Sequence, residues 1–171
     1  MRDDIELLKE CDSGVKMGIQ GIAAVIDDAY GDDFKNLLEN YEEQHVKILG
    51  VIHEKLNEAG ASIREPHPIA RAMANMSTDM KMMMNNSNEK IADIMMDGCN
   101  MGIKSVSKYM NQYAAASKET MQIANDIVVL EQNFMNDLRQ YLWLMCDNSS
   151  KPLYMRSWTC KNWQNVIKWM T

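Results

Sequence analysis

The fold is decided by residues 37–56, which read LLENYEEQHVKILGVIHEKL. Apolar residues recur here every three or four positions, so they share one side of a helix that turns about 100° per residue. His45 falls within this stripe and Glu42 falls at its edge. The stretch therefore predicts an amphipathic helix that carries a Glu-x-x-His pair toward the interior. The apolar stripe comprises Leu38, Tyr41, Ile48, Leu49, Ile52 and Leu56.

Three other stretches repeat this periodicity, which predicts an all-α chain with four long helices. The first is expected to end near Tyr30, the second to occupy residues 32–59, and the fourth to reach residue 145. Ser87 and Ser117 are expected to cap the third and fourth helices. Because the links within each pair are short, the helices form two antiparallel hairpins. The expected caps of the first two helices are Asp3 or Asp4 and Asp32 or Asp33.

Three glycines, Gly14, Gly18 and Gly21, lie inside the first predicted helix. Each weakens a helix by up to ~1 kcal/mol relative to alanine. A compensating interaction is therefore expected, and close packing of a neighbouring helix would supply it. Cys11 and Cys99 fall on the apolar stripes of their helices, where a free cysteine usually acts as a small buried hydrophobe.

A long crossover joins the two hairpins, and it starts with the helix-breaking sequence EPHP at residues 65–68. Apolar residues then return at helical spacing, which predicts a short helix within the crossover. The methionines of this helix have three interpretations: packing against the bundle, contact with a partner, or binding of Cu(I). The residues concerned are Ile69, Met73, Met76, Met80, Met82, Met83 and Met84.

Length and composition limit the classes of function. The length of 171 residues favours a single domain. The formal charge of −6 argues against a general nucleic-acid-binding protein, because binding to phosphates requires a basic face. No signal-peptide core or membrane span is recognised, so a cytoplasmic location without membrane insertion is expected. The four cysteines lack a CxxC pair and fit reduced thiols.

The predicted domain covers residues 1–146, and residues 147–171 form a Trp-rich C-terminal extension. A composition shift and the break around Pro152 separate the two parts. The extension is expected to dock on the bundle, to bind another protein, or to lie peripherally on a membrane surface.

Residues 1–142 resemble small bacterial ferritin-like, rubrerythrin-like four-helix bundles of unknown function. The resemblance is carried by LKECDSG at residues 8–14, the Glu-x-x-His pair, EPHP at 65–68 and DGCNMG at 97–102. It implies a ferritin-like fold in which the long crossover joins the two hairpins. Such domains include both metal enzymes and members that lack a metal site.

Ferritin-like proteins with two metal ions use a glutamate from each of two helices and Glu-x-x-His from each of the other two. This chain offers Glu42, His45 and Glu131 as candidate ligands, while Phe134 stands where the second histidine is expected. The first and third helices provide no glutamate at the matching level. Absence of metal and a weak site for Fe, Mn or Zn therefore both stay open.

The sequence favours a bundle without catalytic activity or cofactor that acts through self-assembly or association with another protein. The alternative is a metal-binding or di-metal oxidoreductase that uses Glu42, His45 and Glu131. No sequence motif of another enzyme class is present.

Overall fold

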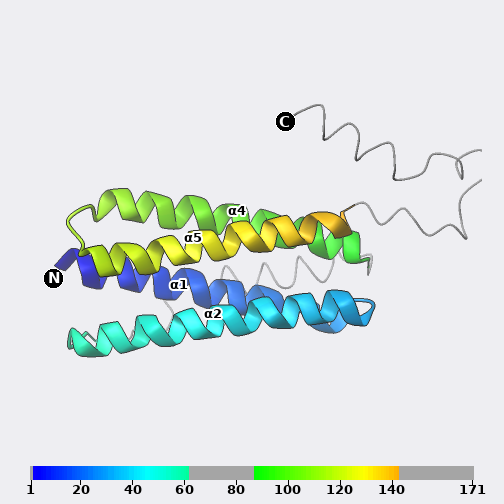
Figure 1. Ribbon diagram of the computed structural model, residues 1–171, viewed down its shortest axis with the longest axis horizontal. Coiled ribbons are helices and arrows are strands. Elements are labelled where there is room, and N and C mark those ends of the chain that lie inside the picture. The colour runs from blue at the N-terminus through cyan, green and yellow to red at the C-terminus, as the bar shows by residue number, and fades with distance from the viewer. Residues whose placement is uncertain (1, 62–86, 143–171) are drawn as a thin grey trace, which may run out of the picture.

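The computed structural model describes residues 2–61 and 87–142, in which four long α-helices lie side by side (Figure 1). The described residues contain no strand, which confirms the all-α prediction for them. Short 3-10 helices follow the first and last long helices, at Ile26–Asp28 and Arg139–Tyr141. The long helices are α1 (Arg2–Val25), α2 (Asp32–Glu58), α4 (Asn88–Gln112) and α5 (Lys118–Leu138).

Hydrogen bonds at the two ends of the bundle fix the directions of the helices. Beyond the end of α1, the backbone of Tyr30 exchanges two hydrogen bonds of 2.8 and 2.6 Å with the side chain of Asn88, the first residue of α4. At the other end, Asp4 accepts hydrogen bonds from the backbone of Ser117 and the hydroxyl of Thr120. Helix α1 is therefore antiparallel to α4 and parallel to α5, as Figure 1 also shows.

The helices pack as two antiparallel pairs, α1 with α2 and α4 with α5, as the sequence predicts. Helix α2 ends at the end of the bundle opposite the start of α4 (Figure 1). The predicted crossover helix and the Trp-rich extension lie outside the described residues.

The core divides into two clusters along the bundle. One is built around Phe34, Leu38 and Phe134, and the other around Leu8, Val15 and Ile127. On α2 the first cluster reaches Tyr41 and the second resumes at Ile52, so the buried His45 falls between them. The polar centre described below therefore lies where the two apolar clusters meet.

The helix ends confirm some predictions and correct others. Ser87 and Ser117 accept hydrogen bonds from backbone N–H groups of the first turns of α4 and α5, as predicted for caps. Helix α2 instead starts after Gly31, which has a φ of 86° and no side-chain cap, so the predicted aspartate cap is wrong. Only glycine adopts this φ without strain, which explains why it precedes the helix. Helix α5 ends at Leu138, earlier than predicted.

Candidate functional site

A buried pair, His45 of α2 and Glu131 of α5, occupies the centre of the bundle. The exposed fractions of the two residues are 1% and 7%. Nδ1 of His45 lies 2.7 Å from the backbone carbonyl of Tyr41, which can only accept, so Nδ1 carries a proton. Nε2 lies 3.2 Å from Oε1 of Glu131. One proton must therefore lie between these two atoms, in an imidazolium–carboxylate pair or on a neutral glutamic acid.

The surroundings favour the charged form of this histidine. Burial by itself lowers the pKa of His45, because a charged ring loses its hydration. The hydrogen bond and the negative charge of Glu131, with the hydrogen bond to Tyr41, outweigh burial and raise the pKa above its usual value of 6.5. The imidazolium–carboxylate form is therefore favoured to a higher pH than for a free histidine.

Aromatic rings close one side of the pair. Phe134 stacks on Tyr41 with ring centres 4.3 Å apart, and it meets His45 edge-on at 6.5 Å. The hydroxyl of Tyr41 donates to Asp137 at 2.6 Å. Phe134, which stands in sequence where a second histidine would be expected, thus packs an apolar ring beside His45.

Two glycines let the backbones of α1 and α4 pass over the pair. A Cβ atom on Gly18 would lie 2.9 Å from Cδ2 of His45, and one on Gly102 would lie 3.3 Å from Oε1 of Glu131. The close packing predicted for the glycines of α1 is thus found at Gly18, where it involves a side chain. The prediction is wrong at Gly14, which has no atom within 4 Å of its Cβ position.

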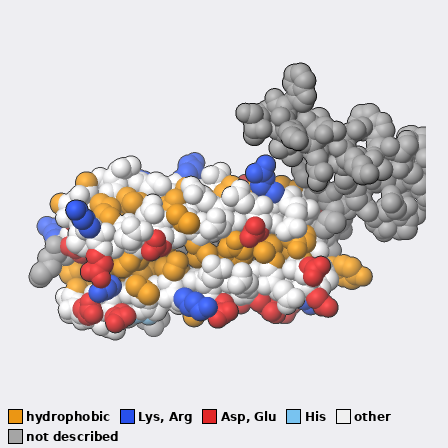
Figure 2. Space-filling view, viewed as in Figure 1, with side chains coloured by type: hydrophobic (Ala, Val, Ile, Leu, Met, Phe, Trp, Pro, Cys, Tyr) orange, Lys and Arg blue, Asp and Glu red, His pale blue; other side chains and the backbone are white. Residues whose placement is uncertain are grey.

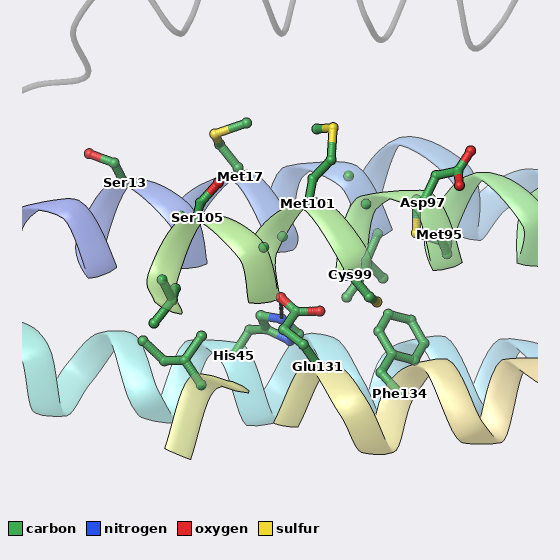
Figure 3. Close-up of a pocket in the computed structure, with 18 of the residues that line it drawn as sticks. Ser13, Met17, His45, Met95, Asp97, Cys99, Met101, Ser105, Glu131 and Phe134 are labelled. Carbon is green, nitrogen blue, oxygen red and sulfur yellow. Dashed lines mark hydrogen bonds and ion pairs between the residues drawn. The ribbon is translucent and has the colours of Figure 1, made fainter. Parts of the chain in front are cut away.

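A cavity of about 320 Å³ opens between α1 and α4 above the pair (Figure 3). His45 and Glu131 lie at its floor, and Met17 and Met101 extend near its outer rim. Its carboxylates are Glu10, Asp97 and Glu131, and no Lys or Arg lines it among the described residues. Its apolar and small lining residues include Gly14, Gly18, Gly21, Ile22, Ile94, Met95, Gly98, Cys99, Gly102, Val106 and Phe134.

The two cysteines of the described helices are buried, as the sequence predicts. Burial and then the charge and hydrogen bonding of Glu131 raise the pKa of Cys99 far above its usual range. Burial, with a contribution from Glu10, raises the pKa of Cys11 to about 12. Both side chains are thus thiols at neutral pH, and a thiol is a poor nucleophile.

The structure brings together two of the three predicted metal ligands. His45 and Glu131 form the buried pair, whereas Glu42 is half-buried and joins no interaction with them. Glu131 is buried, which places this candidate ligand inside the core. Within residues 2–61 and 87–142, no three His, Cys, Asp or Glu side chains are arranged to hold a metal ion.

Sequence reasoning missed a second histidine–carboxylate contact. Nε2 of His53 lies 2.7 Å from Oδ1 of Asp12, and Nζ of Lys16 lies 2.8 Å from Oδ2. Asp12 is buried, and its contact with His53 ties α2 to α1. The i,i+4 spacing of Asp12 and Lys16 was the available signal for an ion pair.

In the part of the chain that the structure describes, no helix has the length and apolar character required to cross a membrane. The chain matches no protein-family model, and no match was found among the curated proteins or the solved structures.

Proposed function

We propose that this protein is a non-catalytic helical bundle that binds a small, largely apolar molecule in the cavity between α1 and α4. The observation that carries the proposal is the cavity itself, which reaches from the surface to the buried His45–Glu131 pair. Apolar walls with a few polar groups and a residue of shifted pKa are typical of ligand sites. Its volume lies near the lower end of the ~300–1,000 Å³ common for such sites.

The glycines favour binding over a purely structural role. Gly18 and Gly102 are explained by the pair beneath them, but Gly14 and Gly98 face open space. Alanine at either position would favour the helix by up to ~1 kcal/mol without meeting another atom. The packing of the described residues gives no reason for glycine at these two positions, which both line the cavity, and room for a ligand there would supply one.

The polar groups favour binding over catalysis. Both ring nitrogens of His45 are engaged, one by Tyr41 and one by Glu131. Cys99 interacts with Glu131, and its pKa is raised rather than lowered. An activated nucleophile needs a neighbouring base that can take its proton, and Glu131, the base beside Cys99, is already paired with His45.

We further propose a ferritin-like arrangement of the chain. Its support is the pairing of antiparallel hairpins and the position of Ala61 and Ser87 at opposite ends, which requires residues 62–86 to connect the two ends. The alternative with Fe, Mn or Zn needs Glu42 or another donor beside the pair. That alternative gains no support from the described residues and stays a prediction.

Filling the cavity tests the binding proposal. The neutral fluorophore N-phenyl-1-naphthylamine is expected to bind the native chain saturably with one site. Gly14→Leu and Gly98→Leu place a side chain in the cavity and should weaken binding at least tenfold. Gly50→Leu is the control, because Gly50 also faces open space but lies outside the cavity. Equal binding by all three variants, or no saturable binding, would refute the proposal.

Association with a protein partner or a second copy is a second candidate. Val46 and Val51 of α2 and Val129 of α5 are exposed. Figure 2 shows hydrophobic side chains in a band along the visible face, over α5 and between it and α2. Apolar bands of this kind favour contact with another surface. Sedimentation of the native chain and of Val46→Glu tests this, since the substitution should reduce any self-association.

A further inference from the structure

We propose that the ligand is an amphipathic amine, with an apolar body inside the cavity and a protonated amine at its rim. The inference rests on the proposed function, because it names the chemical class that the same cavity takes. It is carried by the charges of the cavity lining: three carboxylates and one histidine, with no Lys or Arg among the described lining residues.

The lining disfavours an anion. The formal charges of the three lining carboxylates and a protonated His45 sum to −2. A monocation reduces this charge to −1, whereas a fatty carboxylate increases it to −3. Low-dielectric walls strengthen such differences relative to water. The cavity therefore selects against an acid of the same size and shape.

The amine is assigned to the rim beside Asp97. At the floor Glu131 already pairs with the ring of His45, so no unpaired negative charge is left there for a second cation. At one end Glu10 already interacts with Tyr109, whose pKa burial and Glu10 together raise. Asp97 is exposed and forms no ion pair with another described residue. Figure 3 shows Asp97 at the end of the cavity opposite Ser13.

The walls suit the apolar body. Met17, Met95 and Met101 line the cavity, and methionine adapts its three rotatable bonds to the shape of an apolar partner. The His45–Glu131 pair satisfies its own hydrogen bonds, so an apolar body above it leaves no buried polar side-chain atom without a partner among the described residues. A short alkyl or aryl group thus fits without a new polar contact.

Three probes of equal chain length test the class: octylamine, octan-1-ol and octanoate, each displacing N-phenyl-1-naphthylamine from the full chain. Octylamine should displace the fluorophore at a concentration at least tenfold lower than octanoate, with octan-1-ol between them. Asp97→Asn should weaken octylamine about fivefold and leave octan-1-ol unchanged. Asp126→Asn, which removes an equal charge from α5 outside the cavity, is the control and should change neither.

The outcomes separate the two proposals. If the fluorophore binds but octylamine displaces it no better than octanoate, or not at all, the amine is wrong and the proposed function stands. If Asp126→Asn weakens octylamine as much as Asp97→Asn, the assignment to Asp97 is overturned. If the fluorophore shows no saturable binding, the proposed function itself fails.

Discussion

Helix α2 makes two histidine–carboxylate contacts that differ in what surrounds them. His45 bonds Glu131 in the interior, at the floor of the cavity, where the two residues are only 1% and 7% exposed. His53 bonds Asp12 at 2.7 Å near the surface, with its side chain 32% exposed. Both pairs join a histidine to a carboxylate, but only the buried pair lies directly beneath glycines of two other helices, Gly18 and Gly102. The difference suggests a role for burial that can be tested.

Breaking each pair in turn should give the largest difference in the free energy of unfolding. Glu131→Ala leaves the buried imidazole without its partner, and loss of one member of a buried pair usually destabilises by about 3–5 kcal/mol. His53→Ala removes a partly exposed partner from Asp12, which keeps Lys16, and should destabilise by about 1 kcal/mol or less. Urea unfolding of both variants measures this. Similar losses would show that burial does not separate the two pairs.

The glycines give the next largest effect, and its sign should differ between two positions on one helix. Gly18→Ala puts a Cβ 2.9 Å from the ring of His45, which two hydrogen bonds hold in place, and should destabilise by about 1–3 kcal/mol. Gly14→Ala meets no atom and should stabilise by up to ~1 kcal/mol. Thermal unfolding of the two variants measures both effects. If both substitutions stabilise the protein, α1 does not need a glycine above the pair.

The sequence predicted what depends on neighbours along the chain. Helical spacing and the serine caps are local, so α4 and α5 begin where expected. The burial of Glu131 could not be predicted, because it depends on Gly18 and Gly102 reaching the same level from two other helices. Periodicity defines the face of each helix but not its stagger against its neighbours. The cavity could not be predicted for the same reason. It forms where glycines of α1 and α4, which have no side chain to fill the space, lie at the same level of the bundle.

The buried pair should also make stability depend on pH. Because folding raises the pKa of His45 above 6.5, the folded chain holds this proton more tightly than the unfolded chain. The resulting stability is fully present below pH 6.5 and is lost as pH rises through the folded pKa. The free energy of unfolding lost in this way is about 1.4 kcal/mol for each unit by which the folded pKa of His45 exceeds its unfolded pKa.

Comparison with His45→Gln isolates this effect, because glutamine does not titrate. The free energy of unfolding, measured by urea from pH 5.5 to 9, should fall more steeply for the native chain than for the variant. Glu131 and the backbone of Tyr41 bond the ring. Cys99 interacts with Glu131, and burial raises the pKa of this thiol beyond the pH range measured. Parallel curves would show that folding does not shift the pKa of His45.

The smallest expected effect is that of metal ions on the buried pair. To bind at His45, an ion must displace the proton shared with Glu131 and recruit a further ligand, and the described residues supply no third donor there. Zn(II), Fe(II) or Mn(II) should therefore change the free energy of unfolding at this pair by less than about 0.5 kcal/mol relative to chelator. Because other parts of the chain also contain His and Cys, the measurement compares the native chain with His45→Gln. A metal-induced stabilisation of several kcal/mol that is lost in His45→Gln would mean that Glu42, His45 and Glu131 rearrange into a metal site.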